Sequence, residues 1–329
     1  MIKQIGLSGV KVNILIMNSL LPITLVLIYT GFAIAEPKFA SLENLYNILR
    51  QSSYLIMLAT AQMIVLITRG FDLSVGSVIS MISVSISLVM VRFLQQNPYA
   101  VVWAIGLGCL MGLIVGLAVG SFNGACISFL GVNPFVTTLG MLGIGEGFAT
   151  TLSGGFPISG LPNILTYILS KSYVLGIPAP VILCMAVLTV IYFILNHTIL
   201  GRSFYIIGSN RKAAYVAGLS TRFNLFFAYV LCSLITAIVA ISLTARLGSG
   251  EPALGGGLMM QSLMAAIIGG VSLNGGQGHI LHCVIGGLFV TVLSNGMNMT
   301  NVDSYIQMIV LGIALIAAVF VDGYRRRIR

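Results

Sequence analysis

The chain has 329 residues, of which 58% are hydrophobic and only 7% are charged, and its formal net charge is +9. Soluble globular proteins carry about 25% charged residues, so this composition excludes an ordinary soluble fold. A membrane span needs about 20 mostly apolar residues, and in lipid its backbone polar groups must be paired within the segment. The composition therefore predicts an all-α, polytopic helical membrane protein.

The apolar segments, taken in chain order, predict about ten transmembrane helices, with eight as the lower limit. The expected spans are 13–35, 51–68, 75–94, 100–122, 132–152, 178–198, 223–245, 257–272, 279–298 and 303–321. The region 51–94 and the glycine-rich run 257–272 are the least regular, and either is open to being broken or re-entrant. The shorter apolar stretches at 42–49 and 161–169 are expected to be helices that lie in the membrane interface or pack over the outer face.

The first span has some features of a signal peptide. Lys3 and Lys11 precede its apolar run, and Ala33-Ile34-Ala35 resembles a cleavage site. The run begins at about Ile14 and is longer than the ~7–15 apolar residues of a signal peptide. An uncleaved first span is therefore expected.

The distribution of positive charge predicts the orientation. Ten spans place both termini on one side, where eleven of the 16 Lys and Arg residues fall, and five fall on the other side. The positive-inside rule then predicts that both termini are cytoplasmic. This topology accounts for the net charge, so no nucleic-acid partner is expected. The loops are too short for a further domain, which needs about 50 residues, so residues 1–329 are expected to form a single transmembrane domain.

Neither a metal site nor a nucleotide site is predicted. The five cysteines lie singly in apolar runs, and the three histidines lack metal-ligand spacing. Leu273–Gln277 reads LNGGQ, one letter from an ATPase signature, but the Gly-Lys pair of a phosphate-binding loop occurs nowhere. No cofactor is expected on this chain, and a transport protein without its own ATPase site is expected rather than an enzyme.

Two acidic residues lie close to or within apolar segments. Asp72 is functional by position, or it caps the helix that begins near Ser74, or it pairs with Arg69. Glu146 lies inside its span, or it reaches water from the outer part of the helix. Other polar residues of the spans suit a neutral, hydroxyl-rich solute, but also serve as contacts between helices. The candidates for a translocation path or inner gate are Gly70, Asp72, Ser74, Gly76, Asn123, Asn133, Glu146, Gln261 and Asn274.

The longest inside loop, 199–222, is predicted to contain a short helix. Ser209 or Asn210 can cap it, it would run through Ala217, and Gly218 can end it. The small residues Ala213, Ala214 and Ala217 suit close docking into a partner's groove. The alternative is a basic surface loop that only fixes the topology.

Four blocks, in order along nearly the whole chain, resemble the permease subunits of binding-protein-dependent ABC importers. They are GFDLSVGS at 70–77, NPFVTTLG at 133–140, GRSFYIIGSNRKAAYVAGLST at 201–221 and GGVSLNGGQG at 269–278. The resemblance is closest to the ribose and simple-sugar branch, which includes ribose, xylose, arabinose, galactose and autoinducer-2 permeases. The departures, such as Phe71 for Ile and Ala217 for Ser, are conservative and do not identify the sugar.

The resemblance implies a set of partners. It implies a second permease subunit in a homodimer or related heterodimer, ATPase subunits that hold ATP and Mg, and a periplasmic sugar-binding protein, all at a lipid membrane. Coupling to the ATPase is then expected at Arg202, Gly208, Ser209, Asn210, Ala213, Ala214 and Gly218. The alternative function is a secondary transporter or facilitator for a small polar solute.

Overall fold

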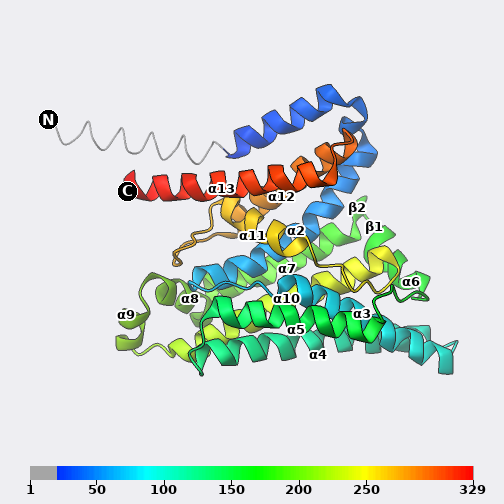
Figure 1. The fold of residues 1–329 in the computed structure, drawn as a ribbon, viewed down its shortest axis with the longest axis horizontal. Helices are drawn as coiled ribbons and strands as arrows, with labels where there is room; N and C mark the ends of the chain where they lie inside the picture. Colours follow the sequence, from blue (N-terminus) through cyan, green and yellow to red (C-terminus); the bar gives the residue numbers. More distant parts are fainter. Residues whose placement is uncertain (1–20, 329) are drawn as a thin grey trace.

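A computed structural model describes residues 21–328 as a bundle of long helices (Figure 1). Each predicted span overlaps a helix; for the range 13–35, residues 13–20 lie outside the described part. The long helices are Leu21–Ala35, α2 (Leu42–Ile67), α3 (Val75–Gln96), α4 (Val101–Ser128), α5 (Pro134–Ser153), α7 (Ala179–His197), α10 (Thr221–Leu247), α12 (Ile280–Met299) and α13 (Ser304–Ile328). The shorter elements are η1 (Pro37–Ala40), α6 (Asn163–Thr166), η2 (Tyr167–Lys171), β1 (Tyr173–Val174), β2 (Ile177–Pro178), α8 (Ile199–Ser209), α9 (Arg211–Val216) and α11 (Leu258–Gly269).

The core is formed by α2, α3 and α10, and α10 packs against both of the others. α10 is apolar along its length and 72% of its most apolar window is buried, whereas the corresponding share is 22% for α4. α4, α5, α7 and α13 lie at the periphery and expose many large apolar side chains, which a soluble protein would bury. Among the described residues, five helices are long and apolar enough to cross a membrane, namely α3, α4, α7, α10 and α12. The chain is therefore a polytopic helical membrane protein.

α4 approaches α10 closely because glycine recurs at every fourth position of its inner face. A Cβ atom added to Gly116 would lie 2.7 Å from the Ala237 Cβ, and one added to Gly120 would lie 2.9 Å from the Val230 Cα. Helices in membranes pack through such small-residue faces, because dispersion contacts replace the hydrophobic effect there.

One sequence prediction about helix extent is wrong, and the alternative left open for 257–272, a broken segment, is the one found. The stretch 42–49 is not a separate interfacial helix, because α2 runs unbroken from Leu42 to Ile67 with no Gly or Pro inside it. The range 257–272 does not form a full span. α11 has 12 residues, which is about 18 Å at 1.5 Å per residue, against a hydrocarbon core of about 30 Å. The helical stretch predicted at 161–169 corresponds to α6 and η2.

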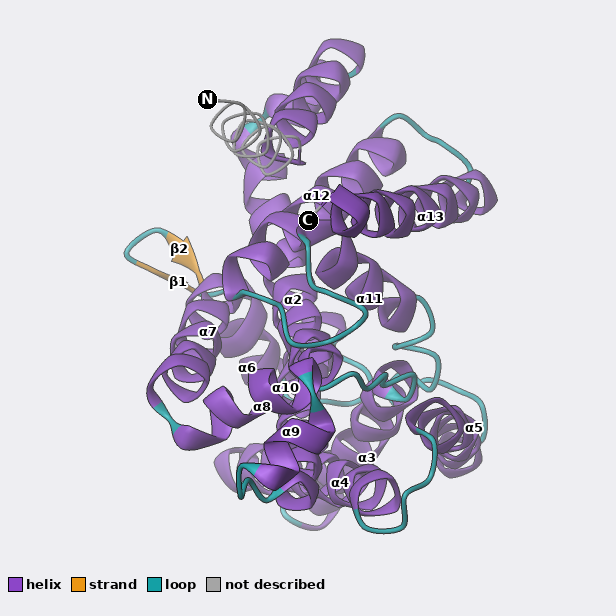
Figure 2. Ribbon diagram, turned by 90° about the vertical axis from the view of Figure 1, so that its left-hand side faces the viewer, coloured by secondary structure: helices purple, strands orange, loops and turns teal. Residues whose placement is uncertain are grey.

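The two ends of the bundle differ. α8, α9, the loop 270–279 and the C-terminal end of α13 lie together at the left of Figure 1, called here the α9 end. The antiparallel hairpin β1–β2 lies at the opposite end (Figure 1) and projects sideways from the bundle when it is viewed from the α9 end (Figure 2).

Candidate functional site

The connector between α2 and α3 contains a buried cluster of polar side chains. Asp72 is 2% exposed, and its Oδ1 accepts hydrogen bonds from the Ser74 N–H at 2.9 Å and the Ser74 hydroxyl at 2.5 Å. Asn123 on α4 donates from Nδ2 to Ser74 Oγ at 3.0 Å. Gln62 on α2 donates from Nε2 to the Asp72 carbonyl at 2.8 Å. The cluster joins α2, α3 and α4 where the chain turns from one helix to the next.

Asp72 holds this turn through hydrogen bonds rather than through an ion pair. The structure gives Arg69 a different partner, because its Nη2 donates to the Ser209 carbonyl at 2.9 Å. Within residues 21–328, Asp72 Oδ2 has no hydrogen-bond partner of normal geometry, although the Cys232 thiol lies beside the carboxyl. A buried carboxylate without a cation is costly, so the favourable contribution of this side chain is its Oδ1 contact with Ser74.

α10 and the segment that follows it also contact this connector. The Tyr229 hydroxyl of α10 donates to the Phe71 carbonyl at 3.3 Å. A Cβ atom on Gly70 would collide with that hydroxyl, and one on Gly76 would lie 2.6 Å from the Gly255 carbonyl oxygen. A larger residue at Gly70 or Gly76 would therefore press against Tyr229 of α10 or against the Gly255 backbone, respectively.

The irregular segment between α10 and α11 packs against a row of serines on α3. Gly248, with φ of 72°, ends α10, and residues up to Gly257 form turns. The Gly255 N–H donates to Ser80 Oγ at 3.0 Å, and the Glu251 N–H donates to Ser83 Oγ at 3.1 Å. Unwound backbone in a membrane protein needs such partners, so the α3 hydroxyls stabilise a break ahead of α11.

α9 forms as the sequence predicted. Asn210 is its N-cap and accepts hydrogen bonds from the N–H groups of Lys212 at 3.1 Å and Ala213 at 3.0 Å. Gly218, with φ of 82°, follows the helix in the left-handed conformation. One prediction is corrected, because Ala214 is fully buried against the rest of the chain and cannot belong to a docking face.

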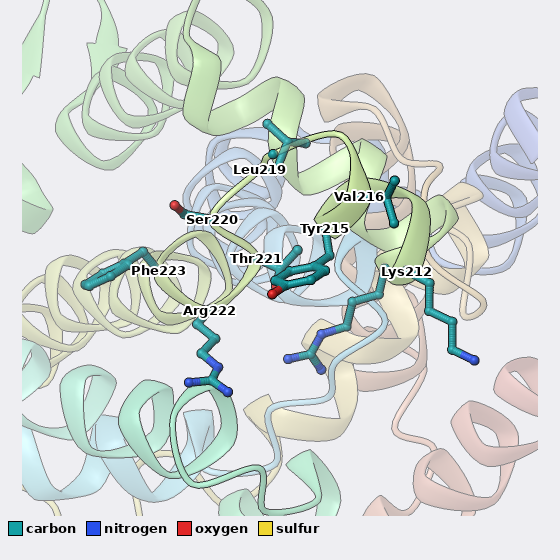
Figure 3. Close-up of a pocket in the computed structure, with 10 residues that line it drawn as sticks. Lys212, Tyr215, Val216, Leu219, Ser220, Thr221, Arg222 and Phe223 are labelled. Atoms are coloured by element: carbon teal, nitrogen blue, oxygen red, sulfur yellow. The ribbon is translucent and has the colours of Figure 1, made fainter.

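α9 and the start of α10 border an open groove of about 1330 Å³ (Figure 3). Its walls include three cationic side chains and two exposed apolar ones. The cations are Arg211, Lys212 and Arg222, and the apolar residues are Tyr215 and Val216, which are 74% and 85% exposed. Figure 3 shows Lys212 and Arg222 extending toward the same open side of the groove. The groove suits a partner surface with acidic and apolar groups.

The remaining predicted residues are scattered rather than gathered. Asn133 caps α5, since its Oδ1 accepts from the Phe135 N–H at 2.9 Å. Glu146 is exposed on α5, Gln261 is half-buried on α11, and Asn274 is exposed in the loop 270–279. Arg202 is exposed on α8, whereas Gly208 at the end of the same helix is buried. No group of three His, Cys, Asp or Glu residues converges as metal ligands in the described part of the chain.

The sequence-based reasoning missed the α3 serines and the contacts of Arg69. Ser77, Ser80, Ser83 and Ser87 recur at helical spacing in an otherwise apolar segment, which is a readable signal for one polar face. No such signal exists for Arg69 and Ser209, which are 140 residues apart in sequence.

Comparison with known proteins finds one matching family and several similar permeases. Residues 44–319 match the family described as "Branched-chain amino acid transport system / permease component". The D-allose transport system permease protein of Escherichia coli K12 is 31% identical over 91% of this chain and 89% of its own length. The ribose import permease protein of the same strain is 32% identical over 88% and 89%, and its L-arabinose transport system permease protein is 32% identical over 91% and 88%. No solved structure matches the chain significantly.

Proposed function

Because the chain belongs to the branched-chain amino acid transport system / permease component family, we propose that it is the membrane-spanning subunit of an ATP-driven importer for a simple sugar or sugar-like solute. The observation that carries the proposal is the match, over about nine-tenths of the chain, to permeases named for allose, ribose and arabinose. The four sequence blocks at 70–77, 133–140, 201–221 and 269–278 all lie inside the matched region.

The proposed topology has ten membrane segments in a bacterial inner membrane, with the α9 end and both termini in the cytoplasm. The exposed cations Arg202, Arg211, Lys212 and Arg222 at the α9 end support this orientation. α11 and the irregular stretch 248–257 together form one of these segments. The N–H groups of Glu251 and Gly255 in that stretch donate hydrogen bonds to serines on α3.

α9 is the proposed docking element for separate ATPase subunits. They would hold ATP and Mg, because the chain has no phosphate-binding motif. The coupling residues proposed are Arg202, Gly208, Ser209, Asn210, Ala213 and Gly218, with the exposed Tyr215 and Val216 added and Ala214 in a supporting role beneath. A second permease subunit and a periplasmic sugar-binding protein complete the proposed assembly.

The translocation path is proposed to be lined mainly by small and neutral polar residues, with Asp72 and Glu146 as its two acidic candidates. The buried cluster of Asp72, Ser74 and Asn123, with Gly70 and Gly76 beside it, is placed to form an inner constriction near the α9 end. Asn133, Glu146, Gln261 and Asn274 lie apart from this cluster and are proposed for other levels of the path.

Reversing the charge of the groove is expected to weaken ATPase docking. The double variant Lys212→Glu, Arg222→Glu should lower the affinity of the ATPase subunits by about 30-fold, since two lost attractions of on the order of 1 kcal/mol each sum to about 2 kcal/mol. Co-purification from detergent at increasing salt measures this, with Lys171→Glu, an exposed cation at the opposite end, as the matched control. Equal retention of the ATPase by both variants would refute docking at α9.

A further inference from the structure

Three segments far apart in the sequence meet at the α9 end. They are the end of α2 at Ile67, the end of α8 at Gly208 and Ser209, and the loop 270–279. The Gly276 N–H donates to the Ile67 carbonyl at 2.8 Å, and Arg69 Nη2 donates to the Ser209 carbonyl at 2.9 Å. One backbone–backbone bond therefore joins α2 to the loop, and the Arg69 side chain joins the connector after α2 to the end of α8.

At Gly208 the segments are tightly packed. A Cβ atom on Gly208 would collide with the Ile67 carbonyl oxygen and lie 2.6 Å from the Gly276 nitrogen. On the α8 side, the Tyr205 hydroxyl donates to the Gly278 carbonyl at 3.0 Å. Because Gly208 lies directly against backbone atoms of Ile67 and Gly276, a shift of α8 toward them would have to move the end of α2 or the loop 270–279.

Arg69 is the one side chain that bridges these segments from a strained backbone. Its φ is 64°, in the left-handed region, which costs a residue other than glycine about 1–2 kcal/mol. Its Cγ lies against Gly275, where an added Cβ would collide with it. Arg69, Ser209, Asn274 and Gly275 also border a cavity of about 300 Å³. Such strain persists only where the surroundings hold it, and it marks positions with a functional constraint.

We propose that Arg69 is a positioning residue that ties α8 and α9 to the α2–α3 connector and the loop 270–279. A displacement of α9 by an ATPase then reaches the Asp72 cluster, which begins three residues beyond Arg69. This inference rests on the proposed function, because it assigns a residue to the coupling step of that importer. The linkage predicts that the three segments move together and stay in contact through the transport cycle.

The variant Arg69→Gly tests the proposal without disturbing the fold. Glycine adopts a φ of 64° without strain, so the variant removes the Arg69 side chain, with its guanidinium link and its contact with Gly275, and adds no backbone strain. In proteoliposomes with the ATPase subunits and the binding protein, uptake of radiolabelled D-ribose, D-allose and L-arabinose is measured together with ATP hydrolysis. We expect sugar taken up per ATP hydrolysed to fall about tenfold, while the ATPase still co-purifies and ATP hydrolysis changes less than about twofold.

A disulfide between α8 and the loop 270–279 tests whether Arg69 acts by joining these segments, because it should then restore the uptake per ATP that Arg69→Gly loses. An ideal Cβ on Gly276 lies 3.3 Å from the Ser209 Cβ, close to the ~3.5–4.5 Å that a disulfide spans. Adding Ser209→Cys and Gly276→Cys to Arg69→Gly should restore uptake per ATP under oxidation and lose it again on reduction. Because Ser209 is itself a proposed coupling residue and Gly276 has a φ of 71°, the reference is the Arg69 chain with the same two cysteines, measured reduced and oxidised in the same assay.

Two results would overturn the inference. The first is unchanged uptake per ATP in Arg69→Gly, and the second is a disulfide, verified by mass spectrometry, that leaves the Arg69→Gly defect in place. The unmodified chain in the same assay reports on the proposed function separately. If it shows no ATP-driven uptake of any of the three sugars, the proposed function fails and not the role of Arg69.

Discussion

Replacing Asp72 with leucine is expected to abolish uptake and to lower the free energy of unfolding by about 3 kcal/mol. The leucine leaves the Ser74 N–H and hydroxyl without their acceptor inside a buried site, so two polar groups lose their partner at once. It also removes the contact that holds the connector where α2, α3 and α4 meet. Thermal unfolding in detergent, followed together with uptake in proteoliposomes, measures both effects.

Asp72→Asn is the matched control for this prediction. Its side chain has the same shape and keeps the oxygen that accepts from Ser74. No Lys or Arg in residues 21–328 forms an ion pair with Asp72, so loss of its charge removes no attraction. We expect the asparagine variant to unfold within about 1 kcal/mol of the unmodified chain. If asparagine were as damaging as leucine, the carboxyl would act through its charge or its proton, contrary to the hydrogen-bonding role described above.

Gly208→Ala is the second change with a large expected effect. The added methyl group has backbone atoms of Ile67 and Gly276 in its way, and backbone cannot rotate aside as a flexible side chain can. Overpacking of this kind costs about 2–3 kcal/mol. We expect the variant to melt at a lower temperature and to lose most of its ATP-driven uptake, because the methyl group displaces α8 from the end of α2 and from the loop 270–279.

Gly106→Ala separates this clash from the general effect of removing a glycine. Gly106 lies in α4, and a Cβ atom there meets nothing within 4 Å. Alanine is favoured over glycine in a helix interior by about 0.5–1 kcal/mol, so this variant should be unchanged or more stable. If Gly208→Ala and Gly106→Ala had the same melting temperature, α8 would not be packed tightly against the end of α2 and the loop 270–279.

Local chemistry made much of the fold predictable. Hydropathy located the helices because lipid requires each backbone group to be paired within its own segment. α9 was predicted to within one residue at its C-terminal end, because Asn210 and Gly218 are strong start and stop signals that act over a few residues. The contact between Asp72 and Ser74 could likewise be predicted, since both residues lie on one short connector.

Features that depend on distant segments were not predictable. The side of α9 that faces the protein is set by the packing of α8 and α10, so the burial of Ala214 could not be inferred from its size. The 12-residue length of α11 depends on hydrogen bonds from residues 251 and 255 to serines on α3. Arg69 resembled an ion-pair partner for its near neighbour Asp72, but a carbonyl 140 positions away is its acceptor.

Dependence of uptake on ATP and on partner proteins tests the central claim most directly. Proteoliposomes are prepared with the chain alone and with the chain, its ATPase subunits and its binding protein, and each is supplied with radiolabelled D-ribose, D-allose or L-arabinose. We predict accumulation of at least one sugar only in the complete vesicles and only with ATP and Mg. Equal uptake by vesicles that contain the chain alone, without ATP, would contradict this and identify a facilitator or secondary transporter instead.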